Sequence, residues 1–222
     1  MNKYQFQQHL RQAQRNVSYY LQKIPKITRY LLIIMLVMFI LQQFINLYPL
    51  VLQSLESGFN PLQLISYAFL HGNFSHLFFN GLAIWMFGSQ IENYWGEKRY
   101  LTFALVCIIG AGITHMIFVN SNVIGISGLV FGLLLAYGMM WPDRKIFLLM
   151  PPVPIKAKYL VMGYGVLLLL NIISQRNDGI AHFAHLGGAL SGFLLIQYWR
   201  GKPPFDKKPG KKKTNAKIHR VK

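Results

Sequence analysis

Long apolar segments separated by short polar stretches follow one another from residue 30 to residue 199. Six such segments lie near residues 30–49, 75–95, 100–119, 125–141, 158–174 and 181–199. Each has roughly 18 to 22 residues, which is enough for an α-helix to cross the hydrocarbon layer of a membrane. The pattern therefore predicts six transmembrane helices.

The stretch that joins the first two segments, VLQSLESGFNPLQLISYAFLHGNF, is apolar but interrupted. Gly58 and Pro61 break it before either part is long enough to span a membrane. It predicts a loop that is half-embedded in the outer membrane interface.

The composition agrees with a membrane protein and not with a soluble domain. Of the 222 residues, 53% are hydrophobic and only 13% are charged, whereas a soluble domain has roughly twice that charged fraction.

The net charge of +17 suggests a nucleic-acid partner at first sight. However, six of the 23 lysines and arginines precede residue 30 and ten follow from Arg200 onward. Basic ends on an apolar body are typical of cytoplasmic flanks that face anionic lipid. We therefore expect the basic termini to contact a lipid bilayer with anionic lipids, and we expect no nucleic-acid partner.

The distribution of basic residues among the short loops predicts the orientation. The second and fourth loops contain Lys98, Arg99, Arg144, Lys145, Lys156 and Lys158. The loop between the first two segments and the one near Asn120–Asn122 contain none, and the fifth contains Arg176 alone. Because cytoplasmic loops carry an excess of lysine and arginine, both termini are expected in the cytoplasm.

These features predict an all-α membrane protein in three parts. Residues 1–29 form a basic cytoplasmic segment, residues 30–199 a six-helix membrane domain, and residues 200–222 a basic disordered cytoplasmic tail. The chain has no diagnostic targeting signal. A multi-pass protein of a bacterial cell (inner) membrane is therefore the default expectation.

Polar side chains gather at the outer ends of three predicted helices. The second helix has His76 and Asn80, the fourth has Ser127, and the sixth has His182 and His185. An unsatisfied polar group in lipid costs a few kcal/mol, so such groups usually have partners or a function. All five lie within roughly two turns of the same membrane face, which predicts a shared site.

Ser127 lies between Gly125 and Gly128, near the start of a helix. Glycines permit close backbone approach, and the free amides at a helix start favour an oxyanion. The alternative is a helix-packing motif of small residues. His185 can accept the serine proton and return it to a leaving amine, or it can simply anchor a helix end at the interface. His182, one turn away, is the second choice as base.

His76 and Asn80 are four residues apart and therefore share a helix face. Both can donate hydrogen bonds to an oxyanion. The alternative interpretation is that His76 and Asn80 bind a metal, but asparagine is a poor transition-metal ligand. Among the acids, only Glu56 and Asp178 lie on the outer side, so a zinc site or an aspartyl dyad lacks its side chains. We expect no metal and no cofactor, which leaves a serine–histidine pair without an acid.

Taken together, these residues resemble the rhomboid family of intramembrane serine proteases. The matching elements are FNPLQLISYAFLHGNFSHLFFN, GSQIENYWGEKRYL, GISG and AHLGG, in this order, over roughly residues 59–192. The Trp-Arg pair found in the first loop of many members is absent, which leaves the packing of that loop and its lipid contacts in question.

The resemblance implies six helices around a water-accessible cavity that opens to the outer side. It implies Ser127 as the nucleophile and His185 as its general base. His76, Asn80 and the backbone amide of Ser127 would form the oxyanion hole.

Supporting roles also follow from the resemblance. Phe131 occupies a position where the family more often has a tyrosine packed against the histidine. His71 matches a recurrent histidine with a structural role, and Glu92 and Arg99 would brace helix ends in the cytoplasmic turn.

The expected function is an intramembrane serine endopeptidase that cleaves transmembrane segments of other membrane proteins near their outer ends. An alternative is a proteolytically inactive rhomboid-like protein that binds transmembrane helices. A small transporter or channel is a further alternative, but its polar residues should line a path across the whole membrane.

Overall fold

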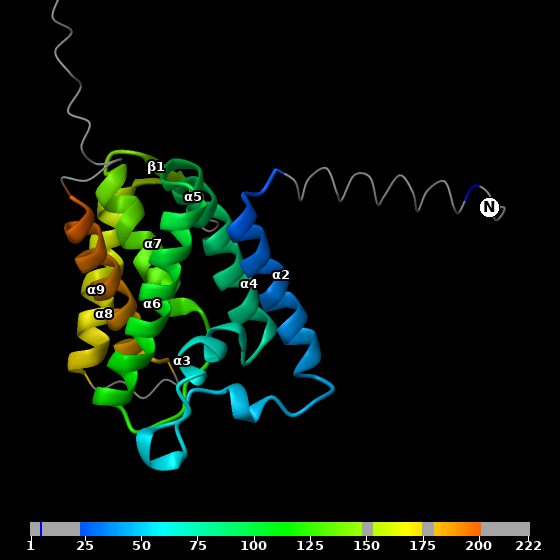
Figure 1. Cartoon of the computed structure of the whole chain (residues 1–222). Helices are drawn as coiled ribbons and strands as arrows, with labels where there is room; N and C mark the ends of the chain where they lie inside the picture. Colours follow the sequence, from blue (N-terminus) through cyan, green and yellow to red (C-terminus); the bar gives the residue numbers. More distant parts are fainter. Residues whose placement is uncertain (1–4, 6–22, 148–152, 175–179, 201–222) are drawn as a thin grey trace, which may run out of the picture.

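Helices form most of the chain in the computed structural model (Figure 1), which describes residue 5 and residues 23–147, 153–174 and 180–200. The long helices are α2 (Lys26–Leu41), α4 (Phe74–Ala83), α5 (Ser89–Trp95), α6 (Glu97–Phe118), α7 (Ser127–Met140), α8 (Ala157–Ile173) and α9 (His182–Trp199). A π-helical segment, Ile84–Gly88, joins α4 to α5 without a break. Most of the predicted N-terminal segment and nearly all of the predicted tail lie outside the described residues.

Five of the six predicted apolar segments coincide closely with helices, but the first is displaced. Helix α2 begins at Lys26 and ends at Leu41, whereas the sequence predicted residues 30–49. Beyond this end, Asn46 Oδ1 accepts a hydrogen bond from the backbone N–H of Tyr48 at 2.9 Å. Such a turn competes with helix formation. The chain therefore leaves the helix early and forms a 3₁₀ turn at Tyr48–Leu50.

Few of the described helices are by themselves long and apolar enough to cross a membrane. Among the described helices, Glu97–Phe118 is long and apolar enough to cross a membrane, while Ser127–Met140 and Ala157–Ile173 are apolar but shorter. The count of six spans therefore stays a prediction.

The connection between α7 and α8 is a two-stranded antiparallel hairpin, which the all-helical prediction did not include. Strand β1 (Lys145–Phe147) pairs with β2 (Pro154–Lys156). Proline lacks a backbone N–H and disfavours helix interiors, and Pro154 precedes the start of α8 by only three residues. Residues 145–147 and 154–156 are accordingly extended, and α8 begins only after Pro154.

The segment between α2 and α4 is compact and contains α3 (Gln63–Ser66) and short 3₁₀ turns. The side chain of Gln63 holds it together: Oε1 accepts from the backbone N–H groups of Gln53 and Asn60, both at 3.2 Å, and Nε2 donates to the carbonyl of Pro49 at 3.0 Å. Satisfying backbone groups from one buried amide gives the loop a fixed shape without regular secondary structure.

Helix α9 packs most extensively against α6 and α7, and glycines bring these helices into backbone contact. A Cβ on Gly188 of α9 would overlap the carbonyl of Gly128 on α7. A Cβ on Gly128 would in turn overlap the side chain of Ala111 on α6. Small residues at such positions are typical of closely packed membrane helices.

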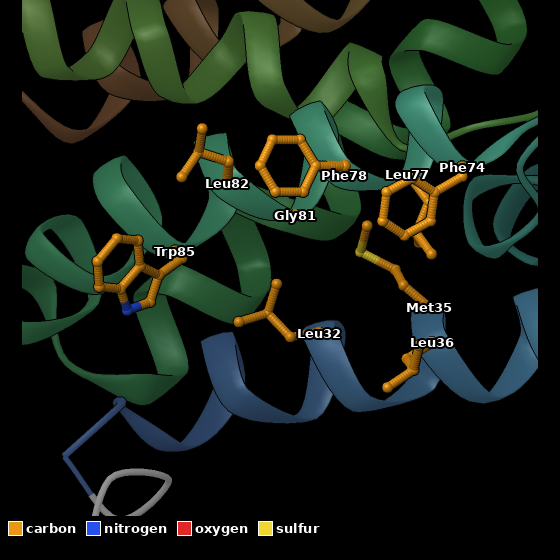
Figure 2. A pocket seen from close by; sticks show the side chains of 9 residues that line it. All are labelled: Leu32, Met35, Leu36, Phe74, Leu77, Phe78, Gly81, Leu82 and Trp85. Carbon is orange, nitrogen blue, oxygen red and sulfur yellow. The ribbon is translucent and has the colours of Figure 1, made fainter. Parts of the chain in front are cut away.

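An apolar hollow lies between α2 and α4 (Figure 2). It has a volume of about 310 Å³ and is lined by Leu32, Met35, Leu36, Phe74, Leu77, Phe78, Gly81, Leu82 and Trp85. Several of these side chains are well exposed, including Phe74 at 67% and Trp85 at 50%. Such an apolar outer surface is what a bilayer solvates well.

The start of α2 is fixed by a buried carboxylate on α5. Glu92 accepts hydrogen bonds from the backbone N–H groups of Ile27 and Thr28 at 2.8 and 2.7 Å, and from Thr28 Oγ1 at 2.7 Å. It thereby satisfies free amides of the first helical turn with a negative charge. Nearby, the guanidinium of Arg99 lies 5.4 Å from the ring of Trp199 near the end of α9. Glu92 therefore caps the start of α2, and Arg99 contacts a ring at the end of α9; a bracing role for Arg99 stays a prediction.

We predict that Glu92→Gln lowers the free energy of unfolding by about 1–3 kcal/mol, because the amide nitrogen of glutamine would face a buried N–H donor. Thermal unfolding in detergent would measure this change. The matched control is Glu97→Gln, whose carboxylate is 53% exposed and pairs with Lys26 at 3.2 Å. The control should change stability by no more than about 0.5 kcal/mol. Equal effects of both substitutions would contradict a capping role for Glu92.

Candidate functional site

A cavity of about 1340 Å³ lies where the starts of α4, α7 and α9 meet the ends of α6 and α8. Its polar lining comes from all five of these helices and from the loops before α4 and α7: Asn73, Ser75, His76, Asn80, His115, Ser121, Asn122, Ser127, Asn171, His182 and His185. The sequence predicted that the outer helix ends would share a site, and the structure brings them to one cavity.

Ser127 and His185 are in direct contact across this cavity. The Nε2 atom of His185 lies 2.8 Å from Oγ of Ser127, although the two residues are 58 positions apart. Ser127 is the first residue of α7, and His185 is in the first turn of α9. A hydroxyl hydrogen-bonded to a neutral imidazole can lose its proton to that ring and become a nucleophile.

The turn before Ser127 requires glycine at position 125. Gly125 has φ +107, a left-handed conformation that is costly for residues with a Cβ. Its N–H donates to the carbonyl of Tyr67 at 2.9 Å. The neighbouring Val123 exchanges backbone hydrogen bonds with Leu52 at 3.0 and 3.2 Å. The loop between α2 and α4 therefore fixes the turn that presents Ser127.

Phe131 covers one face of the His185 ring. It lies one turn after Ser127 on α7, with ring centroids 4.3 Å apart and an interplanar angle of 13°. A stacked ring restricts rotation of the imidazole and so keeps Nε2 directed at the serine. The resemblance had implied this contact.

His76 and Asn80 both line the cavity, and both side chains are closely surrounded by protein. The ring of His76 packs so closely on Gly125 that a Cβ there would overlap it. Asn80 is only 6% exposed, and its Nδ2 has no hydrogen-bond partner among the described residues. A buried amide donor without a partner is costly, and such donors often serve a ligand or an intermediate.

His71 lies behind His76 and does not line the cavity. It is fully buried, and its ring meets that of His76 edge-on at 4.9 Å. Its backbone N–H donates to Gln42 Oε1 at 3.3 Å, which ties the loop to the end of α2. Burial, followed by the charge of His76, lowers the pKa of His71 to about 4, so the ring is neutral at neutral pH.

The structure also separates the two histidines at the start of α9. The ring of His182 lies 6.3 Å from that of His185 and nearly perpendicular to it. Both line the cavity, but Nε2 of His185 is the ring nitrogen that is hydrogen-bonded to Ser127 Oγ. His182 is therefore not placed as the serine's partner.

Sequence reasoning missed His115, near the end of α6. It is 3% exposed, lines the cavity, and donates from Nε2 to the carbonyl of Ser121 at 2.9 Å. This bond holds the loop that leads to Ser127. The sequence signal is the same as for His76 and His185. Residue 115 is also a polar residue near the outer end of a predicted apolar segment.

We predict that Gly188→Ala weakens the site from a distance. The added methyl would meet the Gly128 carbonyl and push α9 away from α7, which separates His185 from Ser127. Stability should fall by about 1–3 kcal/mol, and reaction of Ser127 with a fluorophosphonate should slow at least tenfold, about 1.4 kcal/mol in the barrier.

The matched control is Gly163→Ala on α8, where an added Cβ would have no atom within 4 Å. Because alanine favours helix more than glycine does, this variant should keep both its stability and its labelling rate. Normal labelling of Gly188→Ala would show that the helix contact does not set the serine–histidine distance.

Comparison with known proteins places most of the chain in one family. Residues 59–201 match the family model described as the Rhomboid domain. The chain is 30% identical over 141 residues to proteins called "Rhomboid protease GlpG" from Yersinia pestis (strain Pestoides F), Yersinia pseudotuberculosis serotype O:3 (strain YPIII) and Yersinia enterocolitica serotype O:8 / biotype 1B. Each match covers 61% of this chain and 46% of the relative. The chain thus spans less than half the length of these relatives.

Proposed function

Because the chain belongs to the rhomboid family, we propose that it is an intramembrane serine endopeptidase that cleaves transmembrane segments of other membrane proteins. The observation that carries the proposal is the 2.8 Å contact between His185 Nε2 and Ser127 Oγ inside a large polar-lined cavity. In this proposal Ser127 is the nucleophile and His185 is the general base.

The reaction would run in two stages. Oγ of Ser127 attacks the peptide carbonyl carbon while Nε2 of His185 takes the hydroxyl proton. The imidazolium then gives this proton to the leaving amine as the C–N bond breaks, which leaves an acyl-enzyme. Water in the cavity then gives a proton to His185 and attacks the ester carbonyl. As the acyl C–Oγ bond breaks, the imidazolium returns this proton to Ser127 Oγ, which releases the acid and restores both side chains.

The oxyanion of each tetrahedral intermediate would be held by three donors. These are the backbone N–H of Ser127 at the start of α7, the side chain of His76, and Nδ2 of Asn80. Among the described residues Asn80 Nδ2 has no hydrogen-bond partner. This supports the role, because a donor already in place needs no rearrangement when charge develops.

The membrane arrangement belongs to the same proposal. All six helical segments would cross the membrane, with both termini in the cytoplasm and the cavity at the outer side. The described lysines and arginines support it, because they lie around the start of α2, the α5–α6 turn, the hairpin and the end of α9. Figure 1 shows these elements together at one end of the bundle, opposite α3.

Substrates would have to unwind before they are cut. A peptide bond in a membrane-spanning helix is already hydrogen-bonded within the helix, so its carbonyl is not free to enter the site. We therefore propose that cleavage sites lie near the outer ends of spanning segments and contain helix-breaking or small residues.

The main rival is an inactive relative that binds transmembrane helices without cutting them. Such a protein has no need for a serine–histidine hydrogen bond or for a buried amide donor at the same cavity. Both features are present here, which favours the enzyme.

The deciding experiment replaces Ser127 by alanine in the full chain and measures cleavage of a membrane-anchored reporter and fluorophosphonate labelling. Because the serine and histidine act as one unit, turnover should fall about a thousandfold or more. Ser75→Ala is the matched control, since Ser75 lines the same cavity, and it should retain activity. Cleavage by Ser127→Ala at the wild-type rate would refute the proposal.

Replacing Asn80 by alanine tests the oxyanion donors separately. Loss of one such donor should lower kcat by about 10²–10³-fold, or 2.7–4 kcal/mol, and Asn80→Asp should be equally impaired because a carboxylate cannot donate. Asn171→Ala, at the same cavity, should change kcat by no more than about threefold, or 0.7 kcal/mol. A raised KM with unchanged kcat would instead assign Asn80 to ground-state substrate binding.

A further inference from the structure

The hairpin between α7 and α8 presents two different faces. Lys145 is directly opposite Lys156, and Phe147 is opposite Pro154. Side chains alternate along a strand and directly opposed residues share a face, so these four lie on one face. The intervening Ile146 is on the other face and is buried at 7% exposure. The hairpin thus packs on the protein through isoleucine and shows two lysines, a phenylalanine and a proline to its surroundings.

The exposed face has more positive charge than the protein neutralises. Arg144 and Lys158 flank the lysine pair, and the nearby carboxylate is that of Asp143. This carboxylate accepts a hydrogen bond from Lys158 at 2.8 Å and is 3.4 Å from the ammonium of Lys156. The hydrogen bond from Lys158, together with the two lysine charges, lowers the pKa of Asp143, so it stays ionised. Within the described chain, no carboxylate lies within 4 Å of Lys145.

Like charges placed directly opposite each other in a sheet are destabilising. Asp143 offsets part of this repulsion at Lys156, but no described carboxylate does so at Lys145. An anion bound between the two ammonium groups would remove what remains. A tetrahedral phosphate group, with several acceptor oxygens, can bind two ammonium groups at once.

The base of the hairpin is held in place, so a ligand would not have to order it. The backbone N–H of Ala157 donates to the carbonyl of Arg144 at 2.9 Å, and that of Lys158 donates to Pro142 at 3.0 Å. The Arg144 guanidinium lies 5.3 Å from the ring of Trp141 and donates to Gln90 Oε1 on α5. A site that is ordered before binding loses less free energy when its ligand arrives.

Apolar side chains next to the lysines point to a lipid and not to a free anion. Phe147 is 66% exposed and shares the face of the lysine pair, and Val153 at the edge of the hairpin is 51% exposed. Basic residues next to exposed aromatic and aliphatic side chains are typical of elements that lie at a membrane interface. A soluble phosphate would use the lysines and leave this apolar surface in water.

We propose that the exposed face of the hairpin binds the phosphate of an anionic phospholipid headgroup between Lys145 and Lys156, with Phe147 against the apolar part of the same lipid. The proposal rests on the cytoplasmic placement of the hairpin under "Proposed function", and it is independent of peptide cleavage. It assigns a lipid site to the connection between two helices, separate from the basic termini.

Trp141 provides a local readout for this site because it lies beside Arg144 at the hairpin base. The full chain would be reconstituted in phosphatidylcholine vesicles that contain a minor fraction of phosphatidylglycerol, with bromine on the acyl chains of one lipid or the other. Bromine quenches nearby tryptophan, and a Trp141→Phe reference isolates the signal of Trp141. The ratio of the two quenching curves gives the preference for the anionic lipid at the hairpin.

The test variant is Lys145→Gln with Lys156→Gln. Its control is Lys26→Gln with Lys98→Gln, which removes the same charge from the same end of the protein. Each lysine at an anionic surface contributes about fivefold to binding, so the test variant should lose at least fivefold of the preference. The control should keep it.

Equal losses of the anionic-lipid preference in both variants would assign it to bulk charge and overturn the proposal. If neither variant loses the preference, the proposal is also wrong. If soluble glycerol phosphate displaces the lipid at equal concentration, the site takes free phosphate and the lipid assignment is wrong. Lys145→Arg with Lys156→Arg keeps both charges and should keep the preference, which guards against misfolding of the test variant. Failure of Ser127 to react with a fluorophosphonate would contradict the proposed protease but would not change the lipid preference.

Discussion

The hydrogen bond between Ser127 and His185 depends on a contact in which no side chain takes part. Helices α7 and α9 approach so closely that the backbone of Gly128 meets that of Gly188. Serine and histidine side chains are short, and they can reach each other at 2.8 Å only if the two helix starts are this near. Glycine at the crossing is therefore a condition for the serine–histidine contact and not only for helix packing.

The same contact sets what surrounds the pair. Once α7 lies against α9, Phe131 falls one turn below Ser127 and stacks on the histidine ring. Gly125 then has to turn the chain sharply before α7, and the space it leaves is filled by the ring of His76. The packing of α7 on α9 thus places Phe131, while α4 brings His76 against Gly125.

The molecule also has two chemically distinct ends. The cavity is lined by apolar side chains and by polar groups that include no lysine, arginine or carboxylate, while the described lysines and arginines gather at the other end with the hairpin. Cations are costly in lipid and collect on the cytoplasmic side of membrane proteins, whereas the proposed hydrolysis requires that water reach the cavity. This separation places the two requirements at opposite ends of the same helices.

The sequence by itself determined the family, the positions of five of the six long helical segments and the main polar residues of the cavity. These follow from local properties: hydrophobic length, motif order and the cost of polar groups in lipid. The tertiary structure decided which histidine meets Ser127, that Asn80 Nδ2 has no partner in the described part of the chain, that His115 holds the preceding loop, and that a hairpin joins α7 to α8. It also moved the first helix to Lys26–Leu41. The physical reason is that these features depend on contacts between residues far apart in the chain, such as Glu92 with Thr28 or His185 with Ser127, and hydropathy contains no information about such distances.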